Sequence, residues 1–309
     1  MTRRLALAAI LALTAGRSVH ADVTIRRSMS VALGPTFPTQ LADQTKSQLA
    51  SALPSEIVVR VKGDKSYSST GPLIAITDYA AGSVTLLNPK TKQYAASSLT
   101  EYFDRMAASS QSVTQGMPAE AQQLLHNMKF DVQTKKTGRI ATVQGIRTEE
   151  SVITLSLGMP VDQTFIPAMR MEMHCWIAPA AEVARFAGLK QLAAFSARDK
   201  GALDPTQALQ RVLGQMPGFG DQLRKPLSEL MNGTGNSMLR MTAAVYVPAL
   251  AQAEPPIDPS FPMEEIKTEL LELSTAPIDD SVFSVPADYR SAPLEDLIQA
   301  LFPAPSPQH

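Results

Sequence analysis

Strict alternation of apolar and polar residues constrains the fold of this chain more than any other feature. In the segment 169–177 the apolar residues are Met169, Met171, Met173, Cys175 and Ile177, and the residues between them are Arg170, Glu172, His174 and Trp176. Successive side chains of a β-strand point to opposite faces, so this segment predicts a strand with one apolar and one polar face. A sheet made of such strands buries one side only, which is typical of antiparallel sheets.

Short strands separated by turn residues recur along most of the chain. The predicted strands are 23–29, 57–61, 73–79, 83–87, 92–96, 129–137, 139–144, 147–157, 169–177, 237–247 and 264–275. Asn88-Pro89-Lys90-Thr91 lies between two of them, and proline and asparagine both favour a tight turn. Short connections between consecutive strands favour antiparallel pairing.

Predicted helices are grouped in two blocks rather than alternating with strands. One helix begins at Ser98 or Thr100 and a second follows Pro118, and a later block contains 181–195, 205–213 and 220–231. The missing strand–helix alternation argues against a nucleotide-binding doubly wound fold. The sequence therefore predicts an α+β fold, in which a curved antiparallel sheet carries helices on its concave face or open end.

The first 21 residues have the features of a secretory signal peptide. Arg3 and Arg4 precede an apolar run from Leu5 to Ala15, and small residues end the segment at Ala21. The run is too short to span a bilayer, so we expect cleavage after Ala21, a periplasmic or secreted protein and no integral membrane span after cleavage. We expect a single domain over 22–290 with a helical insert at about 178–231, and a C-terminal helix and proline-rich tail over 291–309.

Charge and cysteine content exclude several classes of partner and linkage. The chain has 28 basic and 29 acidic residues, which gives no electrostatic basis for binding nucleic acid. Cys175 is the only cysteine, so no internal disulfide can form. Its place in an apolar strand predicts a buried, unreactive thiol.

The common catalytic motifs are missing from the sequence. It contains no nucleophile elbow, no zinc-protease helix motif and no glycine-rich phosphate loop. His174 and Cys175 are neighbours in a predicted strand, so their side chains should diverge rather than form a thiol–imidazole pair. We therefore predict no catalytic residue, no metal site and no cofactor, with an enzyme of unfamiliar type using His126 or His174 as the least favoured reading.

Several segments carry a resemblance to a known family. These are 61–65, the hairpin 78–94, 136–138, 143–150, 173–177 and 274–289. Together they resemble a bacterial family of exported proteins grouped under domain of unknown function 4412, which is similar to the LolA/LolB-type lipoprotein carriers. The resemblance implies an incomplete antiparallel barrel wrapped around helices, with an apolar concavity that holds acyl chains in the carriers. The helical insert departs from the carriers, and no carrier residue can be matched one by one.

Two functions are compatible with these features. The first is a carrier of a lipid or acyl ligand, because flexible methionine side chains adapt to hydrocarbon of varying shape. We expect its cavity to be lined by Met169, Met171, Met173, Ile177 and Met241, although the same stripe also fits an ordinary core beneath a helix. The second is a structural or protein-interaction component of the cell envelope, favoured by the proline-rich tail 303–309 after a short helix at 294–301.

Overall fold

One large sheet organises the part of the chain that the structure describes. The computed structural model describes residues 22–35, 37, 54–69, 71–115, 128–161, 164–198, 237–249 and 258–299. The sheet order is β12-β6-β5-β4-β3-β2-β1-β11-β10-β9-β8-β7. The strands are β1 (Val23–Leu33), β2 (Glu56–Lys62), β3 (Lys65–Ser69), β4 (Ile74–Asp78), β5 (Ser83–Asn88), β6 (Gln93–Ser98), β7 (Lys129–Val143), β8 (Ile146–Val161), β9 (Thr164–Ile177), β10 (Met238–Tyr246), β11 (Glu264–Ser274) and β12 (Arg290–Ser291). The helices are α2 (Leu99–Gln115), α4 (Ala180–Arg185), α5 (Ala187–Arg198), α8 (Leu294–Gln299) and the 3-10 helix η2 (Asp280–Phe283).

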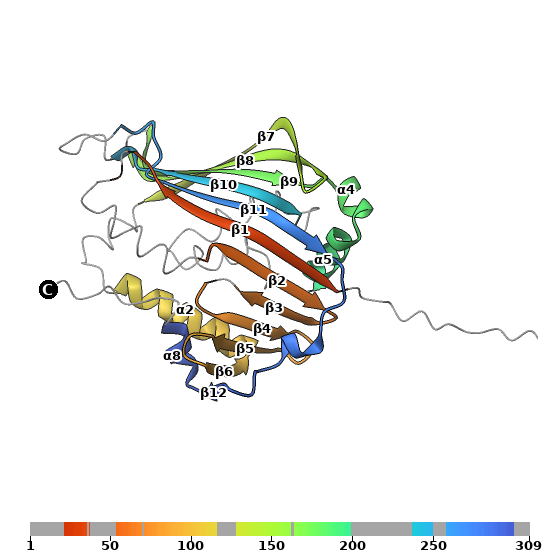
Figure 1. The fold of residues 1–309 in the computed structure, drawn as a ribbon. Helices are drawn as coiled ribbons and strands as arrows, with labels where there is room; N and C mark the ends of the chain where they lie inside the picture. The colour runs from red at the N-terminus through yellow and green to blue at the C-terminus, as the bar shows by residue number, and fades with distance from the viewer. Residues whose placement is uncertain are drawn as a thin grey trace, which may run out of the picture.

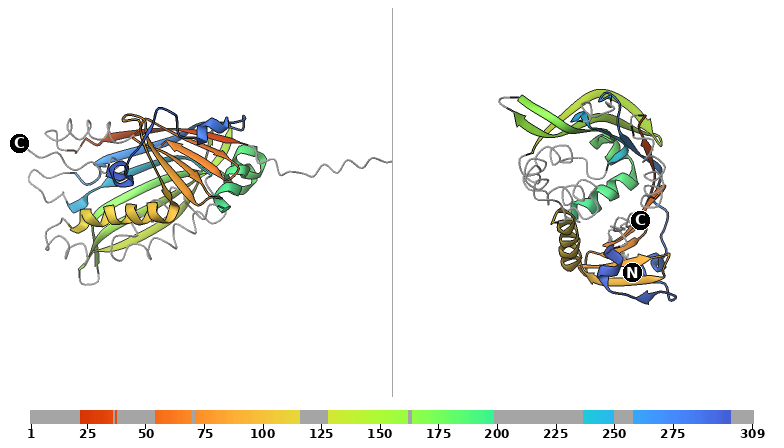
Figure 2. Two further views of the ribbon diagram at one scale, coloured as in Figure 1. Left: turned by 90° about the horizontal axis from the view of Figure 1, so that it is seen from below. Right: turned by 90° about the vertical axis from the view of Figure 1, so that its left-hand side faces the viewer.

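The sheet is curved, unclosed and almost entirely antiparallel. Among the strands that the structure describes, only the short β12 pairs in parallel, with β6, and the edge strands β12 and β7 do not pair with each other. β1 lies at the centre between β2 and β11, so it joins two antiparallel meanders, β1–β6 and β7–β11 (Figure 1). Figure 2 shows that the two meanders curve toward each other, with α5 between them. The predicted α+β class with a curved, incomplete antiparallel barrel is confirmed.

Local sequence signals account for the tight connections. The Asn88 side chain accepts hydrogen bonds from the backbone N–H groups of Lys90 and Thr91, at 3.0 and 3.2 Å, which closes the turn between β5 and β6. Gln144 and Gly145 have φ values of 49° and 75° and form the two-residue turn between β7 and β8. The Ser98 hydroxyl accepts the N–H of Glu101 at 3.1 Å, so Ser98 caps α2 as predicted.

Two predicted boundaries are wrong. The segments 129–137 and 139–144 form one strand, β7, because Gly138 adopts a φ of 76° and absorbs a register shift between Lys136 and Ile140. The predicted helix 181–195 is divided into α4 and α5, because Phe186 has an extended backbone with ψ at 114°. The predicted signal peptide, the helices 205–213 and 220–231, nearly all of the helix after Pro118 and the tail beyond 299 lie outside the described residues.

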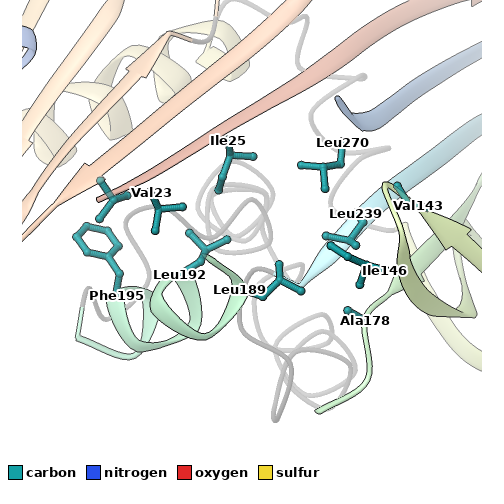
Figure 3. Close-up of a cluster of buried hydrophobic side chains, with 11 residues drawn as sticks. Val23, Ile25, Val143, Ile146, Ala178, Leu189, Leu192, Phe195, Leu239 and Leu270 are labelled. Carbon is teal, nitrogen blue, oxygen red and sulfur yellow. The ribbon is translucent and has the colours of Figure 1, made fainter. Parts of the chain in front are cut away.

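The two faces of the sheet are packed differently. We call the inner face the one that carries Val23 and Ile25, because α5 packs on these residues through Leu189, Leu192 and Phe195 (Figure 3). The remaining members of this cluster are Val61, Val143, Ile146, Ala178, Leu239 and Leu270. α2 and α8 pack on the same face at β5 and β6, through Leu99, Tyr102, Met106, Leu294, Leu297 and Ile298. The opposite, outer face is covered at β3–β6 by η2 and the chain around it.

Candidate functional site

An apolar cluster lies on the inner face of β8, β9 and β10. The strand register joins this region to β1, because Val31 pairs with Ile266, Ile266 with Ala243, Ala243 with Met173 and Met173 with Ile153. Paired residues in neighbouring strands share a face, so all of these side chains are on the inner side. We call this the methionine cluster, and it comprises Val132, Ile153, Leu155, Met171, Met173, Cys175, Ile177, Met238, Met241, Ala243 and Ile266.

The inner-face side chains of β8 and β9 form a row that we call the apolar stripe, from Ile153 to Met159 on β8 and from Ile166 to Met173 on β9. This stripe is buried at one end and exposed at the other. Ile153 and Met173 are 2% and 5% exposed, whereas Met169, Met159 and Ile166 are 38%, 39% and 52% exposed. Met159 pairs with Ile166, and β8 continues its alternation from Ile153 to Met159, so these exposed residues extend the same face. Hydrocarbon side chains therefore run from the core to solvent at the end where β8 and β9 join.

Most of the predicted cavity residues come together. Met171, Met173, Ile177 and Met241 all belong to the methionine cluster, with Met173 and Ile177 buried and the other two partly buried. Met169 lies further along β9 at the exposed end of the stripe. Contact of any of these five residues with a ligand stays a prediction.

A charged residue that the sequence analysis missed lies on this inner face. Arg27 occupies the position between Ile25 and Met29 in the apolar register of β1, and it pairs with Leu270 on β11. Its Nη2 donates to the backbone carbonyl of Met238 at 3.3 Å, and its Nε is buried without a hydrogen-bond partner. Burial holds the pKa of the Arg27 guanidinium below its ordinary value.

A sequence signal for Arg27 exists. The odd-numbered positions of 23–33 are valine, isoleucine, arginine, methionine, valine and leucine, so a single cation interrupts an apolar alternation. A charged side chain is unusual on the apolar face of a strand unless an ion pair neutralises it. Arg27 is therefore a candidate functional residue.

The outer face carries a compact polar cluster around Glu150. The Glu150 side chain is 2% exposed, and its carboxylate accepts hydrogen bonds from Thr137 at 2.7 Å, Arg139 at 3.1 Å and the Nδ1 of His174 at 3.0 Å. A carboxylate can only accept, so the proton of this last bond resides on Nδ1 of His174. Burial raises the pKa of Glu150, but the bonds from Thr137 and His174 and the charge of Arg139 outweigh it and leave the pKa lowered.

The thiol of Cys175 is separated from this polar cluster. Cys175 belongs to the methionine cluster on the inner face, and burial raises its pKa to about 12. His174 contacts Glu150 on the outer face. The prediction that these two side chains diverge is confirmed, and they form no thiol–imidazole pair.

An open cleft of about 480 Å³ lies on the outer face, beside the centre of the sheet. Its walls include Arg26, Arg60 and Glu272, and Arg26 pairs with Glu272 at 3.1 Å and with Glu56 at 2.6 Å. None of the five predicted cavity residues lines this cleft. Pro277, Ile278 and Val282 also line it, so its walls are mixed, and the ion-paired Arg26 on one side does not suit a hydrocarbon ligand.

The described ranges contain neither a cluster of metal-ligating side chains nor a helix able to cross a membrane. No group of three or more His, Cys, Asp or Glu side chains there is arranged to hold a metal ion. Within the same ranges, no helix has both the length and the apolar character needed to cross a membrane.

Comparisons with known proteins give weak similarities only. No family model matches the chain, so membership of the domain of unknown function 4412 family stays a prediction, and no curated protein matches either. Among solved structures, lipoprotein LppX of Mycobacterium tuberculosis is 9% identical with a TM-score of 0.27, over 84% of this chain and 88% of that chain. PNGF-II is 8% identical with a TM-score of 0.32, over 91% of this chain but 33% of that chain, so the chain spans about a third of its length. At these TM-scores neither similarity carries an argument about fold or function.

Proposed function

We propose that this protein is an exported, non-catalytic binder or carrier of a hydrophobic, lipid-like ligand, which it holds against the methionine cluster. One observation carries the proposal. The inner-face side chains of β8 and β9 from Ile153 to Met159 and from Ile166 to Met173 are apolar, and they pass from fully buried to half-exposed. A hydrocarbon chain that enters at the exposed end meets apolar side chains along its length.

The energetics of this arrangement suit a long acyl chain. Removing one methylene group from water is worth about 0.8 kcal/mol, so ten buried methylenes supply about 8 kcal/mol before the entropic cost of binding. A net free energy of that size would correspond to micromolar affinity, so the entropic cost of binding leaves ten methylenes with a weaker affinity, and a longer buried chain is needed to reach the micromolar range. Methionine side chains are unbranched and flexible, so Met171 and Met241 can repack around ligands of different shape.

Three properties belong to this proposal as expectations. Export rests on the leader sequence that ends at Ala21. Absence of catalysis rests on the missing motifs. Relation to the LolA/LolB-type carriers rests on the resemblance of the sequence and implies the same use of a concave sheet face.

A binding titration tests the proposal. Delipidated full-length protein is titrated with a fluorescent analogue of hexadecanoic acid, and we expect saturable binding. Met171→Asn places an amide on the apolar stripe and should weaken binding about tenfold, because the amide loses its water when the ligand binds. Glu172→Gln is the matched control, since Glu172 is the next residue in β9 and points to the outer face.

The result discriminates the carrier from an envelope component that acts only through protein contacts. Circular dichroism first establishes that both variants fold. Absence of saturable binding by the unaltered protein, or unchanged binding by folded Met171→Asn, refutes the carrier function.

A further inference from the structure

Arg27 has an environment that its fold does not explain. It projects from the inner face of β1, between Ile25 and Met29 along the strand and beside Ile57 and Leu270 on the neighbouring strands. Apolar neighbours destabilise a charged side chain, because they exclude the water that would solvate the charge. Arg27 is half-buried, and an arginine on an apolar sheet face is normally paired with a carboxylate.

The polar contacts of Arg27 are few. Among the described residues its guanidinium makes no ion pair, and its hydrogen bond to the Met238 carbonyl is long at 3.3 Å. The Nε hydrogen is buried without an acceptor. The neighbouring Arg26, on the outer face, pairs with both Glu56 and Glu272. Arg26 thus donates through all three of its nitrogens, whereas Arg27 makes one long hydrogen bond with the described residues.

We propose that Arg27 binds the anionic head group of an amphiphilic ligand whose hydrocarbon chain lies along the methionine cluster. This inference rests on the proposed function and names its ligand class: a long-chain carboxylate or phosphate. The planar guanidinium presents several N–H donors in a fork that matches either oxyanion, and the ligand supplies the acceptors that the described residues lack.

The position of Arg27 relative to the cluster fits this assignment. Its guanidinium contacts the carbonyl of Met238, which is itself a member of the methionine cluster and pairs with Ile177. Met169, at the exposed end, lies eight residues from Ile177 along β9, which is roughly 26 Å at about 3.3 Å per residue. A ligand with its head at Arg27 would therefore lie beside apolar inner-face side chains over the length of an acyl chain.

The test compares ligands of equal chain length and different charge. Hexadecanoate, hexadecyl phosphate, hexadecanol and hexadecyltrimethylammonium are titrated below their micelle concentrations into the full-length protein. We expect both anions to bind about 10- to 100-fold more tightly than hexadecanol, and the cation to bind most weakly. Acetate and inorganic phosphate, which carry the charge without the chain, should not bind measurably at the same concentrations.

Two variants test whether Arg27 is the residue that makes the protein prefer anionic ligands to uncharged ones. Arg27→Gln should lower the affinity for hexadecanoate about 10- to 100-fold and leave the affinity for hexadecanol within about twofold. Arg26→Gln, the matched control on the opposite face, should preserve the preference for anions. Arg27→Gln should also unfold at the same or a higher temperature than the unaltered protein, because a half-buried charge that makes no ion pair with the described residues destabilises the fold.

The outcomes separate this inference from the function on which it rests. Binding of hexadecanol and hexadecanoate with equal affinity leaves the carrier function intact and overturns the role of Arg27. Binding of inorganic phosphate as tight as that of hexadecyl phosphate overturns it in favour of a small-anion site. Absence of binding by every chain-bearing ligand overturns both. If Arg27→Gln unfolds at a lower temperature but keeps the preference for anionic ligands, Arg27 has a structural role only and the inference is overturned.

Discussion

Replacing Glu150 by glutamine should destabilise the protein in a strongly pH-dependent way. The Glu150 carboxylate is 2% exposed and joins three partners from two strands, namely Thr137 and Arg139 of β7 and His174 of β9. Glutamine keeps the shape of the side chain but removes its charge. Its NH₂ group then faces N–H donors that need an acceptor.

The magnitude follows from the exposure of the partners. Hydrogen bonds to a charged group contribute about 1.5–3 kcal/mol each, and the bond from Thr137 is the shortest of the three at 2.7 Å. The side chains of Arg139 and His174 are 66% and 37% exposed, so solvent screens their contributions and each is discounted to a fraction of a kcal/mol. We expect Glu150→Gln to lower the free energy of unfolding by about 2 kcal/mol near neutral pH.

The sign of the pH dependence is fixed by the lowered pKa. A carboxyl group whose pKa is lower in the folded state stabilises the fold fully above its unfolded pKa, here 4.5. This stabilisation is lost as the pH falls below that value and through the folded pKa. The difference between the unaltered protein and Glu150→Gln should therefore shrink as the pH falls from about 7 to about 3.

Urea unfolding at several pH values, followed by far-UV circular dichroism, measures this difference. Glu149→Gln is the matched control, because Glu149 is the adjacent residue and its side chain is 50% exposed and paired with Arg147 at 3.1 Å. We expect its effect to stay below about 1 kcal/mol. Equal effects of the two substitutions, or a Glu150→Gln effect that does not change with pH, would refute the reasoning.

Three further substitutions or modifications test the packing. Leu270→Ala should lower the free energy of unfolding, measured by urea titration, by about 2–5 kcal/mol, because Leu270 is 1% exposed in the core. The control Leu271→Ala should change it by less than about 1 kcal/mol, because Leu271 is 43% exposed. Similar losses for the two substitutions would contradict the assigned burial. Cys175 should resist alkylation by iodoacetamide in the folded protein near pH 8 and react after unfolding in urea, because burial raises its pKa to about 12; rapid reaction of the native protein would be inconsistent with this. Gly158→Ala should lower the thermal unfolding temperature, since the added Cβ would lie 2.1 Å from the carbonyl oxygen of Ile166, and an unchanged temperature would contradict that close approach.

Much of the sheet could be predicted because its signals are local. The alternation from Met169 to Ile177 identifies a strand and both of its faces, and the structure places Met173 and Cys175 on the apolar side. Asn88 and Ser98 specify a turn and a helix start through bonds to residues two or three positions away. Such features depend on neighbours in the sequence, so the sequence contains the information needed.

Features that depend on distant residues could not be predicted in this way. The pairing of β1 with β11 joins residues about 250 positions apart, and alternation carries no information about which strand is the partner. The continuity of β7 depends on a bulge in which Thr137, Gly138 and Arg139 lie opposite Glu150 of β8. Arg27 is a mixed case: the alternation over 23–33 places a cation among apolar residues, but the lack of a partner for its Nε is evident only when the neighbouring strands are in place.

Photo-crosslinking tests the central claim most directly. Full-length protein is loaded with hexadecanoic acid that carries a diazirine near the end of its chain, irradiated, and mapped by peptide mass spectrometry. The account predicts adducts on the inner-face residues of β8, β9 and β10, between Ile153 and Met159, between Ile166 and Met173 and at Met241. Adducts confined to the outer face, around Arg60 and Glu272, or spread as in the urea-unfolded protein, would contradict it.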